Sequence, residues 1–397
     1  MKIENEIVAL SAVRTPIGRF GGALKDVMAY ELGAIAIKNA VIRSNIDKDM
    51  ISEVIFGNCR QAGNGPNPAR SAALLAGLSV NIPASTINMA CPSGMKTVFF
   101  SASAILSGQS DFCVAGGMDS MSTIPHMIKG LRFNILKLGD LKIEDGWSDS
   151  KDPVALVSMG DTAEKIAAKY NISRREQDEF AFLSHKKASK AVKDGLFDNE
   201  IVPVLLEPLL NHQRVELLKD ETPRENTSID KLLKLKAVFA KNGSVTAGNS
   251  SAMSDGACAL ILTNRKKAVL HNAKPLFKIV AMVQSAVDGA IMGEGPVVSI
   301  NMVLKKANMT LDDIDLIEVN EAFAAQIIAN EKVVKWDRDK LNVNGGAIAL
   351  GHPTGISGAR IIITLYYALK NRNKELGLAS ICGAGGVTTA IIIKREL

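Results

Sequence analysis

The stretch Asn88-Met89-Ala90-Cys91-Pro92-Ser93-Gly94-Met95-Lys96 places a cysteine between two kinds of sequence. Residues 84–90 before it are an apolar-leaning run typical of a strand, and residues 95–106 after it are typical of a helix. Proline is favoured at the first position of a helix and disfavours a helical conformation for the residue before it. We therefore predict strand, sharp turn, cysteine and helix. A thiol at a helix N-terminus lies near unpaired N–H groups and the helix dipole, which favour the thiolate.

A second stretch, residues 345–358, has the same form with histidine in place of cysteine. A single cysteine is more often a buried small hydrophobe than a nucleophile, and the second stretch changes that interpretation. His352-Pro353-Thr354-Gly355 follows the pattern of Cys91-Pro92-Ser93-Gly94 and precedes another predicted helix, residues 359–369. A thiol and an imidazole at equivalent places would form the Cys/His pair that nucleophilic catalysis requires.

Other features recur along the chain in the same order. The strand predicted over residues 7–13 has a counterpart at 279–283, and Cys113-Val114-Ala115-Gly116-Gly117 has one in Cys382-Gly383-Ala384-Gly385-Gly386. Strands alternate with helices in both halves, which is typical of a layered, mostly parallel α/β fold. We therefore predict an internal duplication whose equivalent helix N-termini face each other across a pseudo-twofold axis.

A more charged and helical segment separates the two halves. It contains predicted helices at 161–170 and 173–194, and Ser173 with Glu176 forms a capping box at the start of the second. The predicted division is an N-terminal half of residues 1–120 plus 241–270, an inserted loop domain of residues 121–240, and a C-terminal half of residues 271–397.

Composition disfavours several classes of protein. The chain has 397 residues and a formal net charge of +6, with scattered lysines and arginines, so no nucleic-acid partner is predicted. The positive balance suits an anionic, phosphate-bearing substrate. No apolar run approaches the roughly 20 residues of a membrane-spanning helix, and residues 1–6 do not resemble a signal peptide. Five cysteines without paired spacing favour a reducing compartment, and we predict a cytoplasmic protein.

Four residues make up the candidate catalytic site: Cys91, His352, Cys382 and Asn320. A Cys/His pair suits acyl transfer, because the imidazole takes the thiol proton and the thiolate attacks a carbonyl. A second cysteine beside a glycine turn suits a second proton transfer. A zinc site is disfavoured, because no two of these residues have short ligand spacing and a fourth ligand is not evident. We expect no metal.

The chain strongly resembles the thiolase family over essentially its full length. The matching stretches lie in family order: residues 88–94, 248–251 with 255–257, 320–323, 344–358 and 382–386. The resemblance implies an α/β thiolase fold, a duplicated five-layered α/β/α/β/α core with an inserted loop domain, in a homodimer or homotetramer. It also implies acyl-CoA substrates, with coenzyme A as substrate or product and no permanently bound cofactor.

The resemblance also implies a role for each candidate residue. Cys91 would be the acylated nucleophile, His352 its base, and Cys382 the acid/base acting on the α-carbon of the second acyl-CoA. Asn320 would hold a water that forms one oxyanion hole with His352. The backbone N–H groups of Cys91 and Ala384, which replaces a family glycine, would form the other.

The remaining candidates concern substrate binding. Ser251 resembles the family residue that contacts the pantetheine arm, and Arg224 resembles one near the nucleotide of coenzyme A. Met159 and Met292 resemble methionines that narrow the acyl pocket, with Phe323 lining it, although core filling is the alternative for both methionines. The resemblance favours condensation of two acetyl-CoA to acetoacetyl-CoA. The alternatives are a broad-range 3-ketoacyl-CoA thiolase of fatty-acid β-oxidation, an acyl-CoA binding protein without turnover, and another condensing enzyme such as a ketoacyl synthase.

Overall fold

The chain folds around one large sheet made of two halves with the same topology. The structure is a computed structural model that describes residues 6–133, 140–147, 151–209 and 212–396. Residues 1–5, which belong to the segment predicted not to be a signal peptide, lie outside the described residues.

The strands of the sheet repeat one order in both halves. They are β1 (Ile7–Arg14), β2 (Gly18–Arg19), β3 (Glu53–Gly57), β4 (Ala84–Ile87), β5 (Phe112–Ser120), β8 (Ser254–Asn264), β9 (Phe277–Ala286), β10 (Leu316–Val319), β11 (Leu376–Cys382) and β12 (Val387–Arg395). The N-terminal half has the order β1-β8-β5-β3-β4, and the C-terminal half has β9-β12-β11-β10. The counterpart of β4 is an isolated parallel bridge between Ile317 and Leu341. Pairing of β1 with β9 joins the halves.

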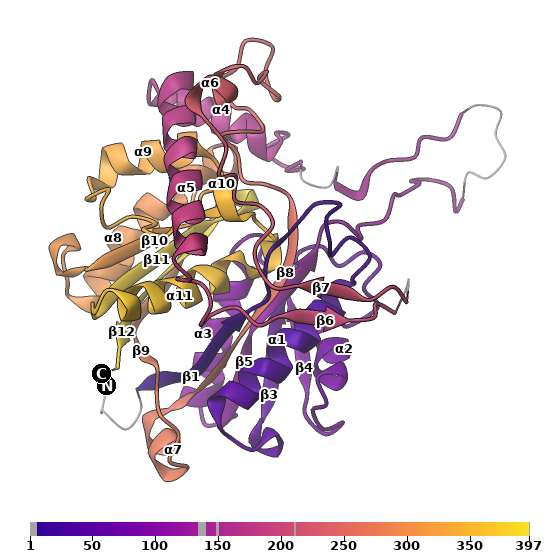
Figure 1. Ribbon diagram of the computed structural model, residues 1–397, viewed down its shortest axis with the longest axis vertical. Helices are drawn as coiled ribbons and strands as arrows, with labels where there is room; N and C mark the ends of the chain where they lie inside the picture. Colours follow the sequence, from indigo (N-terminus) through magenta and orange to yellow (C-terminus); the bar gives the residue numbers. More distant parts are fainter. Residues whose placement is uncertain (1–5, 134–139, 148–150, 210–211, 397) are drawn as a thin grey trace.

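Helices lie on both faces of the sheet and between its halves, which gives the layers α/β/α/β/α (Figure 1). They are α1 (Ala29–Ser44), α2 (Pro68–Leu75), α3 (Ser93–Leu106), α7 (Arg265–Leu270), α8 (Gly295–Ala307), α9 (Ala324–Val334), α10 (Ala347–Leu350) and α11 (Thr354–Asn371). α3 and α11 pack together in a core formed by both halves. α1 and α2 cover the N-terminal half, and α8 and α9 cover the C-terminal half. The predicted duplicated, five-layered core is confirmed.

An inserted segment connects β5 to β8. It contains α4 (Met159–Lys169), α5 (Arg174–Lys193), α6 (Ile229–Leu233) and a hairpin of β6 (Val204–Leu206) with β7 (Val215–Leu217). α5 begins with the predicted capping box of Ser173 and Glu176. An arm, residues 124–133 and 140–147, projects from the body of the molecule (Figure 1). The domain boundaries at residues 120, 240 and 270 stay a prediction.

One of the repeats predicted from the sequence is wrong. β5 and β11 are equivalent in the topology, but Cys113 is the second residue of β5 whereas Cys382 is the last residue of β11. β5 continues through Gly116 and Gly117 to Ser120. Cys113 is therefore a core residue of its strand, and the likeness of the two cysteine–glycine stretches does not reflect equivalent positions.

Glycines allow α3 and α11 to approach each other at their N-termini. A Cβ on Gly94 would lie 2.9 Å from the carbonyl oxygen of Gly355, and a Cβ on Gly57 or Gly117 would lie 2.7 or 2.2 Å from the same atom. Since Cβ atoms essentially never come within 3.0 Å of another heavy atom, these positions exclude any side chain. The turns before the two helices are therefore brought together, as the predicted pseudo-twofold arrangement requires.

Candidate active site

Cys91 lies in a sharp turn between β4 and α3. The preceding Ala90 is left-handed, with φ 53°, a conformation that non-glycine residues rarely adopt. The hydroxyl of Ser93 stabilises the turn by donating to Ala90 O at 2.6 Å and accepting the Met89 N–H at 2.8 Å. α3 begins at Ser93, with Pro92 at its N-cap. The predicted order of strand, turn, cysteine and helix is confirmed.

His352 lies in the corresponding turn before α11, and Ser357 orients its ring. Nδ1 is 2.6 Å from Ser357 Oγ, and that hydroxyl donates to Pro353 O at 2.9 Å. The Ser357 hydroxyl has only one hydrogen, which it donates to Pro353. The hydrogen of the bond between His352 and Ser357 is therefore on Nδ1. Nε2 is buried without a partner among the described residues, so it keeps its lone pair. Burial, with the charges of Arg360 and Arg60, lowers the pKa of His352 to about 3, which leaves a neutral imidazole.

The turn after Cys382 supplies backbone donors to Cys91. Cys382 is buried at the end of β11. The N–H groups of Ala384 and of Cys91 itself lie near enough to the Cys91 sulfur to lower the pKa of this thiol. Gly385 and Gly386 take the left-handed conformations of this turn, with φ 76° and 80°, whereas Ala384 has a negative φ. Alanine is therefore tolerated at the position where the family pattern has glycine.

Burial opposes ionisation of the Cys91 thiol in the resting site, whereas the helix N-terminus is predicted to favour its thiolate. Burial raises the pKa of Cys91 to about 12, and Cys382 also raises it, while Arg60 and the two N–H groups lower it. Removing a thiol from water disfavours its charged form, and here this effect exceeds that of Arg60 and the two N–H groups. The resting pair is a neutral thiol with a neutral imidazole.

Asn320 has a buried side-chain amide with unused hydrogen-bonding capacity. It directly follows β10, and its backbone N–H donates to Ser380 O at 3.0 Å. Its side chain is buried, and neither Oδ1 nor Nδ2 has a partner within the described part of the chain. Because buried polar groups are almost always paired, this amide is suited to hold a water or a polar group of a ligand.

Four of the predicted residues gather in one apolar cluster. Met159, Met292, Phe323 and Cys382 pack together, with Met292 and Phe323 only 2% and 8% exposed. Phe239, which sequence reasoning missed, meets Phe323 edge to face at 6.3 Å between ring centres. The second cysteine therefore lies against methionine and aromatic side chains that can enclose a small acyl group.

The two residues predicted to contact coenzyme A lie outside this cluster. Ser251 is next to it, because its backbone N–H donates to Ala322 O at 3.0 Å. Arg224 is exposed, and its backbone N–H donates to His185 Nδ1 at 3.2 Å. The structure therefore brings Ser251 to the edge of the cluster and leaves Arg224 at the surface.

Sequence reasoning also missed Asp119, a buried carboxylate that connects the two halves. Its Oδ1 accepts the N–H groups of Cys59 and Arg60, both at 3.0 Å. Its Oδ2 accepts the Thr354 hydroxyl at 2.7 Å and the Gly355 N–H at 2.5 Å, at the start of α11. A single acidic residue near the end of the otherwise uncharged strand β5 is the sequence signal that could have identified Asp119.

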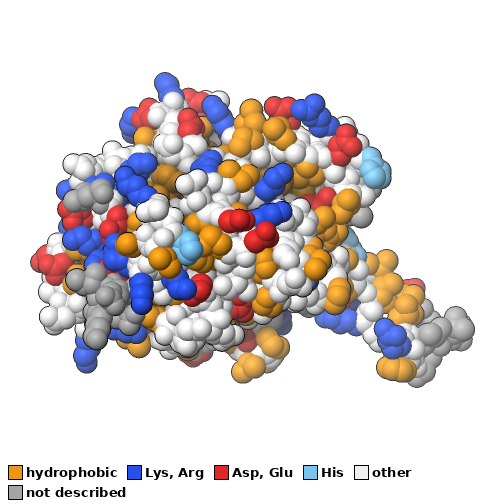
Figure 2. Space-filling view, turned by 90° about the horizontal axis from the view of Figure 1, so that it is seen from below, with side chains coloured by type: hydrophobic (Ala, Val, Ile, Leu, Met, Phe, Trp, Pro, Cys, Tyr) orange, Lys and Arg blue, Asp and Glu red, His pale blue; other side chains and the backbone are white. Residues whose placement is uncertain are grey.

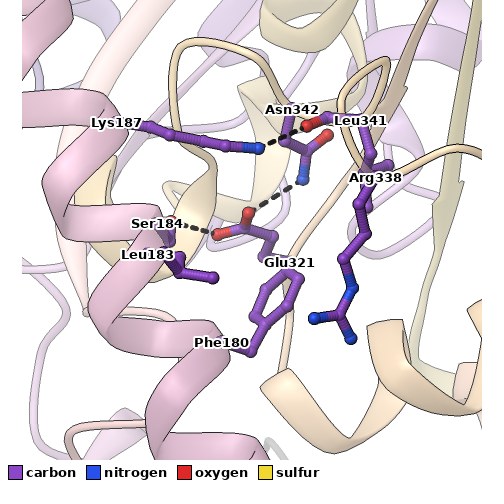
Figure 3. A pocket seen from close by; sticks show the side chains of 8 residues that line it. All are labelled: Phe180, Leu183, Ser184, Lys187, Glu321, Arg338, Leu341 and Asn342. Carbon is purple, nitrogen blue, oxygen red and sulfur yellow. Dashed lines mark hydrogen bonds between the residues drawn. The ribbon is translucent and has the colours of Figure 1, made fainter. Parts of the chain in front are cut away.

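A small cavity adjoins the residue after Asn320 (Figure 3). Glu321 lines it, and its buried carboxylate accepts from Ser184 Oγ at 2.7 Å and from Asn342 Nδ2 at 2.8 Å. The same carboxylate accepts the Ile348 N–H of α10 at 3.2 Å. These bonds connect the Asn320 loop to α5 and to the segment before His352. The residues around the cavity therefore help to position the site.

Neither a cluster of metal ligands nor a membrane-spanning helix is present in the described ranges. There, no three His, Cys, Asp or Glu side chains are placed to hold a metal ion, and no helix is long and apolar enough to cross a bilayer. All five cysteines are free thiols. Cys91 lies close enough to Cys59 to raise the pKa of that thiol, and Cys382 lies close enough to Cys91 to raise its pKa.

Comparison with known proteins defines the class to which this fold and site belong. Residues 7–266 match the family description "Thiolase, N-terminal domain", and residues 273–395 match "Thiolase, C-terminal domain". The chain belongs to the thiolase family and is an acyltransferase.

Individual relatives resemble the chain over its whole length. An acetyl-CoA acetyltransferase of Cupriavidus necator is 44% identical over 395 residues, which cover 98% of this chain and 100% of the relative. The crystal structure of the Bacillus anthracis acetyl-CoA acetyltransferase has a TM-score of 0.96 and 42% identity, with 100% of both chains covered. Human mitochondrial 3-ketoacyl-CoA thiolase has a TM-score of 0.95 and 37% identity, also with 100% of both chains covered.

Proposed function

We propose that this chain is an acetyl-CoA C-acetyltransferase that catalyses the reversible Claisen condensation of two acetyl-CoA to acetoacetyl-CoA and coenzyme A. The observation that supports this most strongly is the position of Cys382. It lies in one apolar cluster with Met159, Met292 and Phe323, and it is close enough to Cys91 to raise the pKa of that thiol. A small acyl group on Cys91 would fit between the second thiol and this apolar wall.

In the first half-reaction, Cys91 attacks the thioester carbonyl of acetyl-CoA while His352 Nε2 takes the thiol proton. Since thiol and imidazole are both neutral at rest, the proton moves as the sulfur attacks. The tetrahedral oxyanion accepts hydrogen bonds from the N–H groups of Cys91 and Ala384. Collapse of the adduct expels coenzyme A, which receives the proton from His352, and leaves acetyl-Cys91.

In the second half-reaction, Cys382 gives its proton to His352 Nε2, and the resulting thiolate removes a proton from the α-carbon of a second acetyl-CoA. Burial raises the pKa of Cys382 to about 12, so its thiolate is a strong base for this weakly acidic C–H. A water on the Asn320 amide, together with His352, stabilises the enolate oxygen. The α-carbon attacks acetyl-Cys91, the Cys91–acyl bond breaks, the departing Cys91 sulfur takes the proton from His352, and acetoacetyl-CoA forms.

Coenzyme A is a substrate and product in this scheme, with no permanently bound cofactor. Ser251, at the edge of the apolar cluster, would contact the pantetheine arm, and the exposed Arg224 would lie near the nucleotide. The net charge of +6 favours its phosphates. Five free thiols suit a reducing compartment, and we assign the protein to the cytoplasm.

Acyl-chain preference is tested by comparing coenzyme A-dependent cleavage of acetoacetyl-CoA and 3-ketooctanoyl-CoA. We expect kcat/KM to be at least about tenfold higher for acetoacetyl-CoA, because extra methylenes would overpack the cluster of Met159, Met292 and Phe323. Comparable or faster cleavage of the longer substrate would instead favour a broad-range 3-ketoacyl-CoA thiolase. Cleavage of neither would favour a non-catalytic acyl-CoA binding protein.

We also propose that the chain forms a homodimer or homotetramer. β4 is an end strand of the sheet, and an open groove beside it is lined by Ile87 and Phe100. Unpaired edge strands readily pair with another chain. The arm carries further exposed apolar side chains, including Phe133 and Ile143 (Figure 2). Sedimentation equilibrium is expected to give two or four chains per particle, and a monomer at micromolar concentration would contradict the proposal.

A further inference from the structure

The residues on either side of Asn320 are held by one shared partner, although the Asn320 side-chain amide has none within the described ranges. The Asn342 side chain pairs with the backbone of Val319, because it accepts the N–H and donates to the carbonyl oxygen, both at 2.9 Å. Asn342 Nδ2 also donates to Glu321 Oε1 at 2.8 Å. One side chain therefore bonds both neighbours of Asn320.

The carboxylate of Glu321 is held on its other side as well (Figure 3). Its Oε2 accepts the Ser184 hydroxyl of α5 at 2.7 Å and the Ile348 N–H of α10 at 3.2 Å. A Cβ on Gly346 would lie 2.2 Å from Glu321 Cδ, so the absence of a side chain at Gly346 admits the carboxylate. Three hydrogen bonds and this close approach fix the position of the Glu321 side chain.

The two groups assigned to the enolate oxygen differ in how they are held. The His352 ring is oriented directly by its bond to Ser357. The Asn320 amide has no such partner in the described part of the chain, so its direction depends on the backbone of its loop. Backbone bonds to residues 249–251 hold the end of this loop, and the Glu321 side chain anchors its beginning.

We propose that Glu321 is a positioning residue of the carbon–carbon bond step, because it fixes the loop that orients the Asn320 amide toward the water at the enolate oxygen. The inference rests on the proposed role of Asn320. Both Glu321 oxygens accept hydrogen bonds from the protein, so Glu321 is not assigned a contact with substrate. Acetylation of Cys91 by acetyl-CoA forms no enolate, so only one half-reaction depends on Glu321.

The test compares two reactions that place the same acetyl group on Cys91. With acetoacetyl-CoA the leaving group is the enolate of acetyl-CoA, whereas with acetyl-CoA it is coenzyme A. Each rate is measured in a single turnover with excess enzyme, without added coenzyme A, from substrate radiolabelled in the transferred acetyl group. The reaction is quenched in acid, and the labelled acetyl-enzyme is counted.

Glu321→Gln is expected to slow acetylation from acetoacetyl-CoA about tenfold. One donor to the carboxylate then faces an NH₂ group, which cannot accept its hydrogen bond, and the Asn320 loop shifts. Acetylation from acetyl-CoA should stay within about twofold of the wild type. Asn320→Ala is the reference for the enolate step and should lower the acetoacetyl-CoA rate about 100-fold, again with little effect on the acetyl-CoA rate.

Glu31→Gln is the matched control. Glu31 is also a buried carboxylate with two bonded oxygens, but it lies on α1 and accepts the N–H groups of Met28 and Leu209, at 2.9 and 2.8 Å. Its replacement should leave the ratio of the two rates unchanged. A general loss of stability would likewise lower both rates together.

If Asn320→Ala is selective, equal losses of both rates in Glu321→Gln, or a loss of neither, would overturn the inference. If Glu321→Gln does not fold, Ser184→Ala is measured in the same way, because it removes one donor to the carboxylate and leaves a smaller side chain; an unchanged ratio there would also overturn the inference. Failure of the proposed function appears separately, as an Asn320→Ala variant that loses both reactions equally or neither, and it removes the basis of the inference with it.

Discussion

Replacement of Cys91 by alanine is expected to lower kcat/KM for acetoacetyl-CoA cleavage by about 10⁴-fold or more. The variant removes the atom that carries the acyl group, and no other described side chain is assigned that role. The turn itself should persist, because its hydrogen bonds come from Ser93 and from Asn88, whose Oδ1 accepts the Ala90 N–H. The measurement is the coenzyme A-dependent loss of the acetoacetyl-CoA enolate absorbance.

Cys113→Ala provides the matched control. This residue is also a buried free thiol, but it lies near the start of β5 in the core. Activity should stay within about threefold of the wild type, since removing a buried small group mainly affects stability. Substantial turnover in Cys91→Ala, with an unchanged fold, would exclude Cys91 as the nucleophile.

Replacement of Cys382 by alanine is expected to separate the two half-reactions. Condensation and cleavage should fall about 10³-fold, the loss typical for a missing general acid or base. Acetylation of Cys91 by acetyl-CoA should continue, because it uses Cys91, His352 and the backbone donors. Steady-state cleavage and single-turnover trapping of radiolabelled acetyl-enzyme measure the two activities independently.

His352→Asn is the contrasting variant for that experiment. It removes the base for the first half-reaction, so both acetylation and condensation should fall. If Cys382→Ala lost acetylation in the same proportion as condensation, Cys382 would be needed for the first half-reaction as well, and its assignment to the α-carbon would fail.

Local chemistry made much of the fold predictable. Pro92 and Gly94 specify a turn and a helix start whatever surrounds them, and the same pattern at His352 identifies the repeat. The two matched turns predict the duplicated core, and the repeated strand order and the close approach at Gly355 agree with it. The two turns depend on residues that are neighbours in the chain, which is why the sequence alone reveals them.

Features that depend on distant contacts were not predictable. The tautomer of His352 follows from Ser357 bonding both the ring and Pro353. The raised pKa of Cys91 follows from burial by residues distant in the sequence, which outweighs the nearby N–H groups and Arg60. The false match of Cys113 with Cys382 arose because two similar short stretches occupy different positions along equivalent strands, one near the start of β5 and the other at the end of β11.

The central claim, that an acetyl group is carried on one particular thiol, is tested most directly by locating that group. The enzyme is mixed with acetyl-CoA alone, quenched in acid and digested, and the acetylated peptide is identified by mass spectrometry. We predict a single acetyl thioester on Cys91, present in Cys382→Ala and absent from Cys91→Ala. Acetylation of Cys382 or Cys59 in the wild type, or none on Cys91, would contradict the account.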